Sequence, residues 1–495
     1  MTIIVASTHK ERTKKRLFLI RSYIFTNILK LLTIFIRKTS FLMSFNDIFS
    51  AQRNFFLQGN TFSADFRKNA LKKLRKNLKD NESRLYEAIY ADFRKSEFDT
   101  YSTELSIIYA EIGYFLKRLD RLHRPQKVRT NMANLPGKFR LHREPLGNVL
   151  IIGAWNYPYQ LSLVPMIDAI AAGNTCILKP SELPENTMRL MAELINGNFP
   201  KEYLYVTEGG VPETTELLQL RFDKIFFTGS PKVGKIVYKE AAANMVPVTL
   251  ELGGKSPTVV TAKADLKAAA RRIVWGKYLN AGQTCVAPDY LYVEDSIKDE
   301  FLELLKQNIE NNAYGKNSDC YAAIINSRNY DRLYSMIDKD KIYFGGDCDK
   351  EALHIGPTIL KDVEWSDKVM QEEIFGPILP VLTFSDLRQV IDKIKSMEKP
   401  LASYIFSRDK KEQDLFLNEI SSGGACVNDV MMHIVNEFAP FGGVGNSGIG
   451  NYHGEYGFDC FSHHKTVLYK PSRLENKIKY PPYSKLQADI IKKII

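Results

Sequence analysis

The chain has 495 residues, too many for one hydrophobic core, and this length predicts roughly two to four domains. Its composition, with 44% hydrophobic and 25% charged residues, excludes a fibrous or disordered chain and is typical of a globular protein. The net charge of +11 would suggest a nucleic-acid or membrane partner, but residues 1–42 hold nine Lys or Arg against one acid and leave only +3 on the remainder. We therefore expect no nucleic-acid partner.

The basic segment 1–42 contains an apolar stretch at 17–36, which Arg21 and Lys30 interrupt. No run of about 18–20 uncharged residues is left for a membrane span. The segment could be a basic amphipathic anchor or a targeting peptide. The alternative that we favour is that translation starts at Met43, so that membrane association could arise only through residues 1–42.

A chain that begins at Met43 is expected to be soluble and to keep its full activity, because every motif described below lies after that residue. The measurement is a comparison of its specific activity and its distribution between soluble and membrane fractions with those of the full chain. Insolubility, or loss of membrane targeting in cells, would favour the anchor.

Helical spacing of apolar residues predicts amphipathic helices over 66–93 and 102–122. The polar stretch 127–144, which contains Leu135-Pro136-Gly137, predicts a hairpin. Beyond it, short apolar runs alternate with helical patterns, which predicts a parallel sheet covered by helices. Strands are expected at 148–153, 174–180, 203–210 and 224–230, with helices from about 161, between the second and third strands, over 212–219 and from 232.

The second half, from about residue 251, repeats this alternation of short apolar runs and helical patterns. Strands are expected at 256–261, 289–295, 399–407 and 423–429, and helices over 264–279 and up to about 313. Residues 442–450, GGVGNSGIG, match G-x-G-x-x-G, but no apolar strand precedes them, so a tight loop is predicted instead of a dinucleotide site. The chain closes in a basic tail in which the prolines of YPPYS (480–484) predict an extended arm.

Two strand ends carry residues suited to a nucleotide, since ligands of such sheets bind at the carboxyl edge. The strand KIFFTGS leads into a turn and a helix, whose glycines and free N–H groups suit a phosphate. That segment is Gly229, Ser230, Pro231, Lys232, Val233 and Gly234. The run NTCILKPSE ends in Lys179 and Glu182, a cation and an acceptor for a ribose. Each signal alone is weak, because a glycine at a helix start is usually only a cap.

Three further residues suggest covalent chemistry on a carbonyl. Cys285 lies in the turn-prone stretch GQTCVAP, Glu251 ends an apolar run, and Asn156 follows a strand end. Taken singly, the cysteine could be an inert thiol and the glutamate a solvated acid. Together, a thiolate can add to the carbonyl carbon, a carboxylate can activate water, and an amide can donate to the oxyanion. The six cysteines include no C-x-x-C pair and the histidines no ligand-spaced cluster, so we expect no metal and a cytoplasmic location.

Seven blocks in order resemble the aldehyde dehydrogenase superfamily over residues 43–485. They are GAWNYP, KPSE, FTGS followed by Gly234, LELGGKSP, GQTC, EEIFGP and PFGGVGNSGIGNYHG. The runs GGVPETTELL, GQTCVAPDY, GNSGIGNYHG and YPPYS resemble the class 3 and fatty aldehyde dehydrogenase branch. His453-Gly454-Glu455-Tyr456 departs from that branch, and the end KLQADIIKKII lacks the hydrophobic tail of some of its members, so we expect no tail anchor.

The resemblance implies that Cys285 is the nucleophile, that Asn156 holds the oxyanion and that Glu251 activates water, so that the product is a free carboxylic acid. It implies that NAD, with NADP also accepted, is held by residues 229–234 at the pyrophosphate and by Lys179 and Glu182 at the adenine ribose. Glu373 and Phe375 match the nicotinamide-ribose positions, and Trp155 is a further expected cofactor contact. The substrate class implied is a medium-chain or long-chain aliphatic or an aromatic aldehyde.

The implied fold is α/β, with a Rossmann-type NAD(P)-binding domain at 43–250, interrupted by the hairpin 127–145. A catalytic domain at 251–440 and a C-terminal oligomerisation and tail segment at 441–495 would complete it, and a homodimer is the expected state. Two alternatives remain: a non-catalytic NAD-binding or structural protein on the same fold, and a cofactor-free cysteine hydrolase, which would need a histidine base.

Overall fold

The computed structural model describes residues 44–312, 314–315, 318, 321–474 and 477–494. The predictions for residues 1–42 therefore lie outside the described residues. The described residues before Ala51 are Ser44 and the first six residues of α2 (Phe45–Leu57), and the unit that begins at Ala51 carries all the sheets of the described residues. Within the described residues, no helix has both the length and the apolar character that a membrane crossing requires.

The predicted N-terminal helices are α3 (Ala64–Asp80), α4 (Glu82–Phe93) and α6 (Ser106–His123). α3 begins where the Ser63 hydroxyl accepts from the Asp65 N–H at 3.2 Å, and it buries the apolar stripe of Leu71, Leu74 and Leu78. Between α4 and α6 lie the short α5 (Glu97–Thr100) and a π-helical turn, Tyr101–Leu105. The sequence did not predict this turn, which directs Glu104 into the interior.

The first sheet has the order β17-β7-β6-β3-β4-β5, and all its strands are parallel except β17. Its strands are β3 (Asn148–Ile152), β4 (Thr175–Lys179), β5 (Leu204–Val206), β6 (Lys224–Thr228), β7 (Val248–Glu251) and β17 (Gly448–Ile449). The intervening helices are α7 (Gln160–Ala172), α8 (Glu185–Asn196), α9 (Val211–Leu218) and α10 (Pro231–Ala243). The chain builds outward from β3 to β5 and then returns to the other side of β3, so the strand order reverses there. Such a switch point is where open α/β sheets bind ligands.

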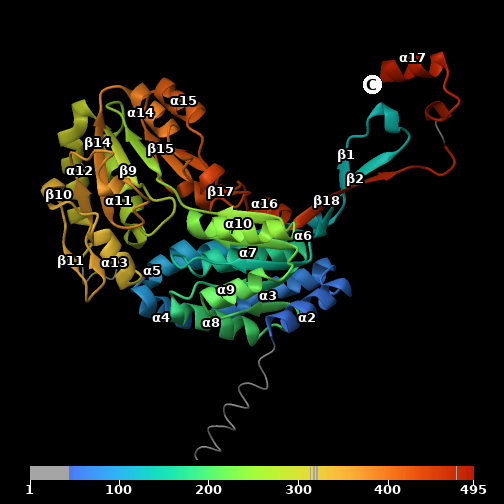
Figure 1. The fold of residues 1–495 in the computed structure, drawn as a ribbon, viewed down its shortest axis with the longest axis horizontal. Helices are drawn as coiled ribbons and strands as arrows, with labels where there is room; N and C mark the ends of the chain where they lie inside the picture. The colour runs from blue at the N-terminus through green and yellow to red at the C-terminus, as the bar shows by residue number, and fades with distance from the viewer. Residues whose placement is uncertain (1–43, 313, 316–317, 319–320, 475–476, 495) are drawn as a thin grey trace, which may run out of the picture. The chain divides into compact units, whose positions relative to one another are not determined.

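The second sheet, visible with its helices in Figure 1, has the order β10-β13-β14-β9-β8-β15-β16. Its strands are β8 (Pro257–Val260), β9 (Tyr290–Glu294), β10 (Ile342–Phe344), β13 (Thr358–Leu360), β14 (Ile378–Phe384), β15 (Ala402–Phe406) and β16 (Gly424–Val427). The helices are α11 (Leu266–Tyr278), α12 (Lys298–Asn311), α13 (Ser327–Tyr334), α14 (Leu387–Lys395) and α15 (Lys410–Glu419). The predicted strands β8, β9, β15 and β16 are confirmed, whereas β10, β13 and β14 were not predicted.

The predicted hairpin is confirmed as β1 (Gln126–Val128) and β2 (Lys138–Pro145), and β2 also pairs with the unpredicted β18 (Ser462–Tyr469). A two-stranded ribbon, β11 (Cys348–Asp349) and β12 (His354–Ile355), completes the sheets of the described residues. Residues 445–447 form a 3-10 turn before the two residues of β17, which agrees with the predicted tight loop. The tail is not helical over 480–484, and it continues into α17 (Lys485–Ile494), a helix that we did not predict.

Candidate active site

The candidate site lies where β4, β3, β6 and β7 end side by side. The neighbouring carboxyl ends are Lys179, Ile152, Thr228 and Glu251. After β3 the chain continues through Trp155 and Asn156 to α7, and the Gly153 N–H is still bonded to the Lys179 carbonyl at 3.0 Å. The sheet order therefore explains why residues far apart in the sequence share one edge.

Cys285 follows a tightly folded turn at the end of α11. In this turn Asn280 and Ala281 have positive φ values of 53° and 51°. Gly282 has φ of 72°, and a Cβ on it would lie 2.3 Å from the Gly376 carbonyl oxygen, so glycine is required. Cys285 is a free, partly exposed thiol. Burial, with the charges of Glu373 and Glu251, raises the pKa of Cys285 to about 12, so this nucleophile needs a base to form the thiolate.

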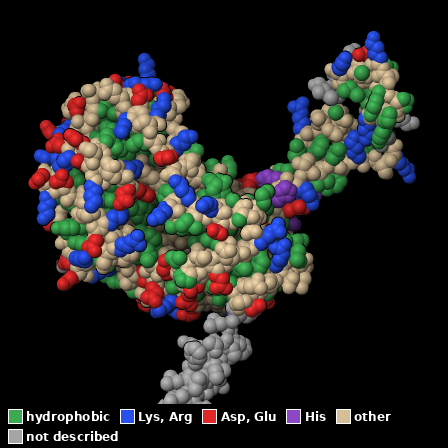
Figure 2. Space-filling view, in the orientation of Figure 1, with side chains coloured by type: hydrophobic (Ala, Val, Ile, Leu, Met, Phe, Trp, Pro, Cys, Tyr) green, Lys and Arg blue, Asp and Glu red, His purple; other side chains and the backbone are tan. Residues whose placement is uncertain are grey.

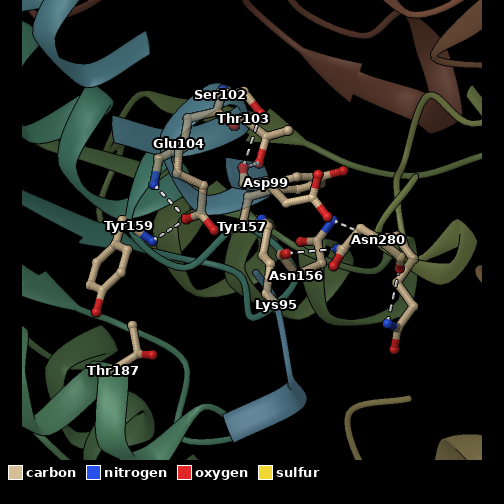
Figure 3. Close-up of polar contacts among 12 residues, drawn as sticks. Lys95, Asp99, Ser102, Thr103, Glu104, Asn156, Tyr157, Tyr159, Thr187 and Asn280 are labelled. Atoms are coloured by element: carbon tan, nitrogen blue, oxygen red, sulfur yellow. Dashed lines mark hydrogen bonds and ion pairs between the residues drawn. The ribbon is translucent and has the colours of Figure 1, made fainter. Parts of the chain in front are cut away.

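Asn156 is buried, and its side chain joins the β3 loop to the cysteine loop. Its Nδ2 donates to the Gln283 carbonyl at 3.0 Å, and its own carbonyl accepts from Asn280 Nδ2 at 2.9 Å (Figure 3). An amide nitrogen carries two donors, so one remains for an oxyanion. The next residue reaches the same loop, because the Tyr157 hydroxyl lies 2.7 Å from Thr284 Oγ1.

Glu251 is the last residue of β7 and is 3% exposed. Neither carboxylate oxygen has a hydrogen-bond partner among the described residues. Burial alone raises the pKa of Glu251 well above its ordinary value, and its charge acts on Cys285. A buried carboxylate that is unpaired among the described residues and whose charge acts on a thiol with a raised pKa is suited to accept a proton from that thiol or from a water molecule.

Lys179 and Glu182 contact each other at the end of β4. Lys179 Nζ donates to the Pro180 carbonyl at 2.8 Å and to Glu182 Oε2 at 3.2 Å. The lysine is buried and its pKa is lowered, mainly by burial, with Glu182 acting in the opposite direction. The glutamate side chain is 44% exposed. The pair therefore offers a fixed cation and a movable acceptor.

The expected phosphate segment forms the amino end of α10. The Ser230 hydroxyl accepts from the Val233 N–H at 3.4 Å, and Pro231 occupies the first turn. Gly234 allows the helix to approach β7, because a Cβ there would lie 2.6 Å from Leu252 Cδ2. Lys232 and Val233 are exposed. The backbone can thus approach a phosphate at this helix end.

The EEIFGP segment lies against the glycines that follow Glu251. A Cβ on Gly253 would lie 2.1 Å from Glu373 Oε2. Burial, together with the charge of Asp289, raises the pKa of Glu373 to about 8, although the Gly254 N–H acts in the opposite direction. Phe375 has a positive φ of 50° and packs edge-on against Trp155, with ring centroids 5.3 Å apart. All the expected nicotinamide-side residues are therefore in contact with this edge of the site.

Sequence reasoning missed the residues that hold this segment in place. Asp289 Oδ1 accepts from the Ile374 N–H at 2.8 Å, and its Oδ2 pairs with Lys255 Nζ at 2.5 Å. Arg332 donates to the Ile374 carbonyl at 2.7 Å. The only sequence signal was that Lys255 and Asp289 lie inside the LELGGKSP and GQTCVAPDY blocks, without a pattern that pairs them.

Solved structures and curated proteins resemble the chain over most of its length. A Staphylococcus aureus AldH in a substrate-bound state has a TM-score of 0.89 and 44% identity, with 91% of this chain and 99% of that chain covered. The mouse aldehyde dehydrogenase family 3 member A2 is 46% identical over 87% of this chain and 90% of its own length. The mouse dimeric NADP-preferring aldehyde dehydrogenase is 44% identical over 88% and 97%, respectively.

The non-catalytic alternative has no support in these comparisons, and the expected class 3 resemblance is confirmed by them. The family model described as the aldehyde dehydrogenase family matches residues 44–467. That range contains both large sheets and every candidate site residue. The chain therefore belongs to the aldehyde dehydrogenase family.

Proposed function

We propose that the chain oxidises an apolar aldehyde to a carboxylic acid through a thioester on Cys285. The observation that supports this most is the buried Glu251 carboxylate, unpartnered among the described residues and electrostatically coupled to the Cys285 thiol. Glu251 takes the thiol proton, and the thiolate adds to the aldehyde carbon to give a tetrahedral oxyanion. The second N–H of the Asn156 amide and the Cys285 backbone N–H stabilise that oxyanion.

The second half-reaction hydrolyses the thioester. After it has released the thiol proton to solvent, Glu251 removes a proton from water, which attacks the acyl carbon; the C–S bond then breaks, the acid leaves, and the sulfur takes a proton to restore the thiol. The presence of Glu251 at the end of β7 therefore favours the free acid as product.

The residues at the switch point fit NAD(P). The amino end of α10 suits the pyrophosphate, the Lys179–Glu182 pair suits the adenine ribose, and Glu373, Phe375 and Trp155 suit the nicotinamide side. Gly229 precedes this helix end, and glycine is required there because a Cβ would lie 2.6 Å from the Phe227 ring. When bound, the nicotinamide ring accepts the hydride that the oxidation releases.

Glu182→Gln is expected to narrow the preference for NAD over NADP. Glu182 can accept from a ribose 2′-hydroxyl but repels a 2′-phosphate, and a hydrogen bond to a charged group is worth about 1.5–3 kcal/mol, or roughly 10–150-fold. That range is an upper limit, because the exposed glutamate can turn away and leave Lys179 to pair with the phosphate. We therefore propose a modest NAD preference with NADP still used.

The measurement is kcat/KM with each cofactor, and Glu185→Gln is the matched control, since Glu185 lies on the surface of α8 and pairs with Arg189. A wild-type chain that prefers NADP, or a ratio that Glu182→Gln leaves unchanged, would show that Glu182 does not contact the ribose.

The apolar substrate class is supported by the segment that follows β16. It carries the exposed side chains Met432, Val435 and Phe438. The segment adjoins Tyr404, whose hydroxyl donates to the Val286 carbonyl next to Cys285 at 2.6 Å. A series of straight-chain and aromatic aldehydes, followed by NADH absorbance, tests this. We expect KM to fall with chain length, and a preference for short polar aldehydes would contradict it.

A homodimer in the cytoplasm is the assembly that we propose. The antiparallel sheet β1–β2–β18 and the connection between its first two strands carry exposed apolar residues, among them Val128, Leu135 and Tyr469, which suit contact with a second copy. The mouse relative described as dimeric supports the same state. Cys176, Cys285, Cys348, Cys426 and Cys460 are free thiols, as a reducing compartment would give.

A further inference from the structure

Lys95 and Glu104 form an ion pair without any exposed side-chain surface. Lys95 Nζ lies 2.7 Å from Glu104 Oε1. Arg94, with a left-handed φ of 57°, ends α4 just before Lys95, and the π-helical turn 101–105 holds Glu104. A buried ion pair adds little net stability compared with apolar residues of the same volume. Stability alone therefore does not explain the pair, and the question is what the fixed positions of these two side chains hold in place.

Glu104 holds the beginning of α7. Its second oxygen, Oε2, accepts from the Tyr159 N–H at 2.8 Å and from the Gln160 N–H at 3.2 Å (Figure 3). These N–H groups lie three and four residues after Asn156. The carboxylate is thus bonded at once to the Lys95 ammonium and to the backbone that carries the oxyanion donor.

Lys95 contacts the same loop from its other side. Its Nζ lies 4.0 Å from the centroid of the Tyr157 ring, within the range of a cation–π contact. The Tyr157 hydroxyl lies 2.7 Å from Thr284 Oγ1, one residue before Cys285. Asn156 itself is bonded to the Gln283 carbonyl at 3.0 Å. A continuous series of buried contacts therefore joins the ion pair both to the Asn156 amide and to the loop that carries Cys285.

We propose that Lys95, Glu104 and Tyr157 are positioning residues that hold the Asn156 amide against the cysteine loop, and that they act on the oxyanion only through Asn156. The inference rests on the proposed roles of Asn156 and Cys285. A displacement of about 1 Å in such a group can lower the rate by as much as 10²-fold. The network would therefore affect kcat while leaving the cofactor site unchanged.

Tyr157→Phe is the first test, because it removes only the hydroxyl that reaches Thr284. Tyr159→Phe is the matched control: Tyr159 is also buried, two residues away, but its hydroxyl donates to the Leu85 carbonyl at 2.9 Å. We expect Tyr157→Phe to lower kcat about tenfold, with KM for NAD and the melting temperature close to those of Tyr159→Phe. Equal kcat in the two variants would overturn the proposal.

The second test repeats Tyr157→Phe in an Asn156→Ala background, which is expected to retain measurable activity because loss of one oxyanion donor costs about 10²–10³-fold. If Tyr157 acts through Asn156, its substitution changes kcat less than about twofold in that background, since coupled residues are not additive. The same tenfold loss in both backgrounds would overturn the inference alone. Wild-type activity of Asn156→Ala would instead contradict the proposed role of Asn156.

The ion pair is tested by Lys95→Met/Glu104→Gln, which removes both charges and keeps an acceptor for the two N–H groups of α7. We expect kcat to fall by about tenfold or more with folding retained, and the loss to shrink in the Asn156→Ala background. A folded double variant with wild-type kcat would overturn the proposal. If the double variant does not fold, the Tyr157→Phe cycle decides the proposal.

Discussion

Cys285→Ala is expected to lower kcat by about 10⁴-fold or more while leaving NAD binding intact, since removal of a covalent nucleophile typically has effects of this size. Without the sulfur no thiohemiacetal forms, so no hydride is released. Cofactor binding should survive because Lys179 and the α10 amino end do not depend on the thiol. The measurements are NADH formation and quenching of protein fluorescence by NAD.

Cys426→Ala is the matched control. Cys426 is partly buried on β16, and its Sγ lies 3.3 Å from His433 Nδ1, so among the cysteines that the structure describes it has the nearby histidine that a histidine-based hydrolase would need. We expect this variant to retain wild-type turnover. Appreciable oxidation by Cys285→Ala, or a comparable loss in Cys426→Ala, would contradict the assignment of the nucleophile.

Glu251→Gln is expected to lower steady-state turnover by about 10²–10⁴-fold, the range of a general base. Glutamine has the same shape but cannot take a proton from water, whereas the thiol can still lose its proton to solvent for a single acylation, so deacylation is the step that is slowed most. Mixing with aldehyde and NAD therefore gives a rapid burst of NADH followed by a slow phase. Unchanged steady-state turnover would refute the role of Glu251 as a base. Glu373→Gln is the comparison variant, because a defect on the cofactor side of the site should raise KM for NAD instead of slowing deacylation.

The pH dependence of turnover should follow Glu251. Burial raises the pKa of this carboxyl, so it stays protonated to a higher pH than an exposed glutamate and cannot act as a base below that point. We therefore expect kcat to rise as the pH increases through the pKa of Glu251 and this limb to be absent in Glu251→Gln. A limb that persists in the variant would assign the titration to another group.

The sequence predicted the parts of the site that depend on local pattern. A buried strand followed by glycine and a helix can be recognised within one segment, which is why the ends of β3, β4 and β6 were placed correctly. The strands β10 and β13 have three residues each, too few for a periodic signal, and β14 contains Pro380, which argues against an internal strand. The structure nevertheless places Pro380 inside β14, where it is the register partner of Leu360 in the parallel pair β13–β14.

The supporting contacts of the site could not be predicted in this way. Lys255 and Asp289 are 34 residues apart in the sequence. Glu104 lies 55 residues before Tyr159, and its carboxylate accepts a hydrogen bond from the Tyr159 N–H. Such pairs form only when the tertiary fold brings their elements together, and a lone lysine or glutamate in a helical stretch is normally a solvated surface residue. The resemblance to a family supplied the catalytic roles, but it did not reveal the buried Lys95–Glu104 pair.

The most direct measurement of the central claim is the site of the acyl-enzyme. Glu251→Gln is mixed with NAD and a straight-chain aldehyde, quenched in acid and analysed by intact and peptide mass spectrometry. We predict one acyl group per chain, on the peptide that contains Cys285, and none in Cys285→Ala/Glu251→Gln. Turnover without any adduct, or an acyl group on another cysteine, would contradict the mechanism.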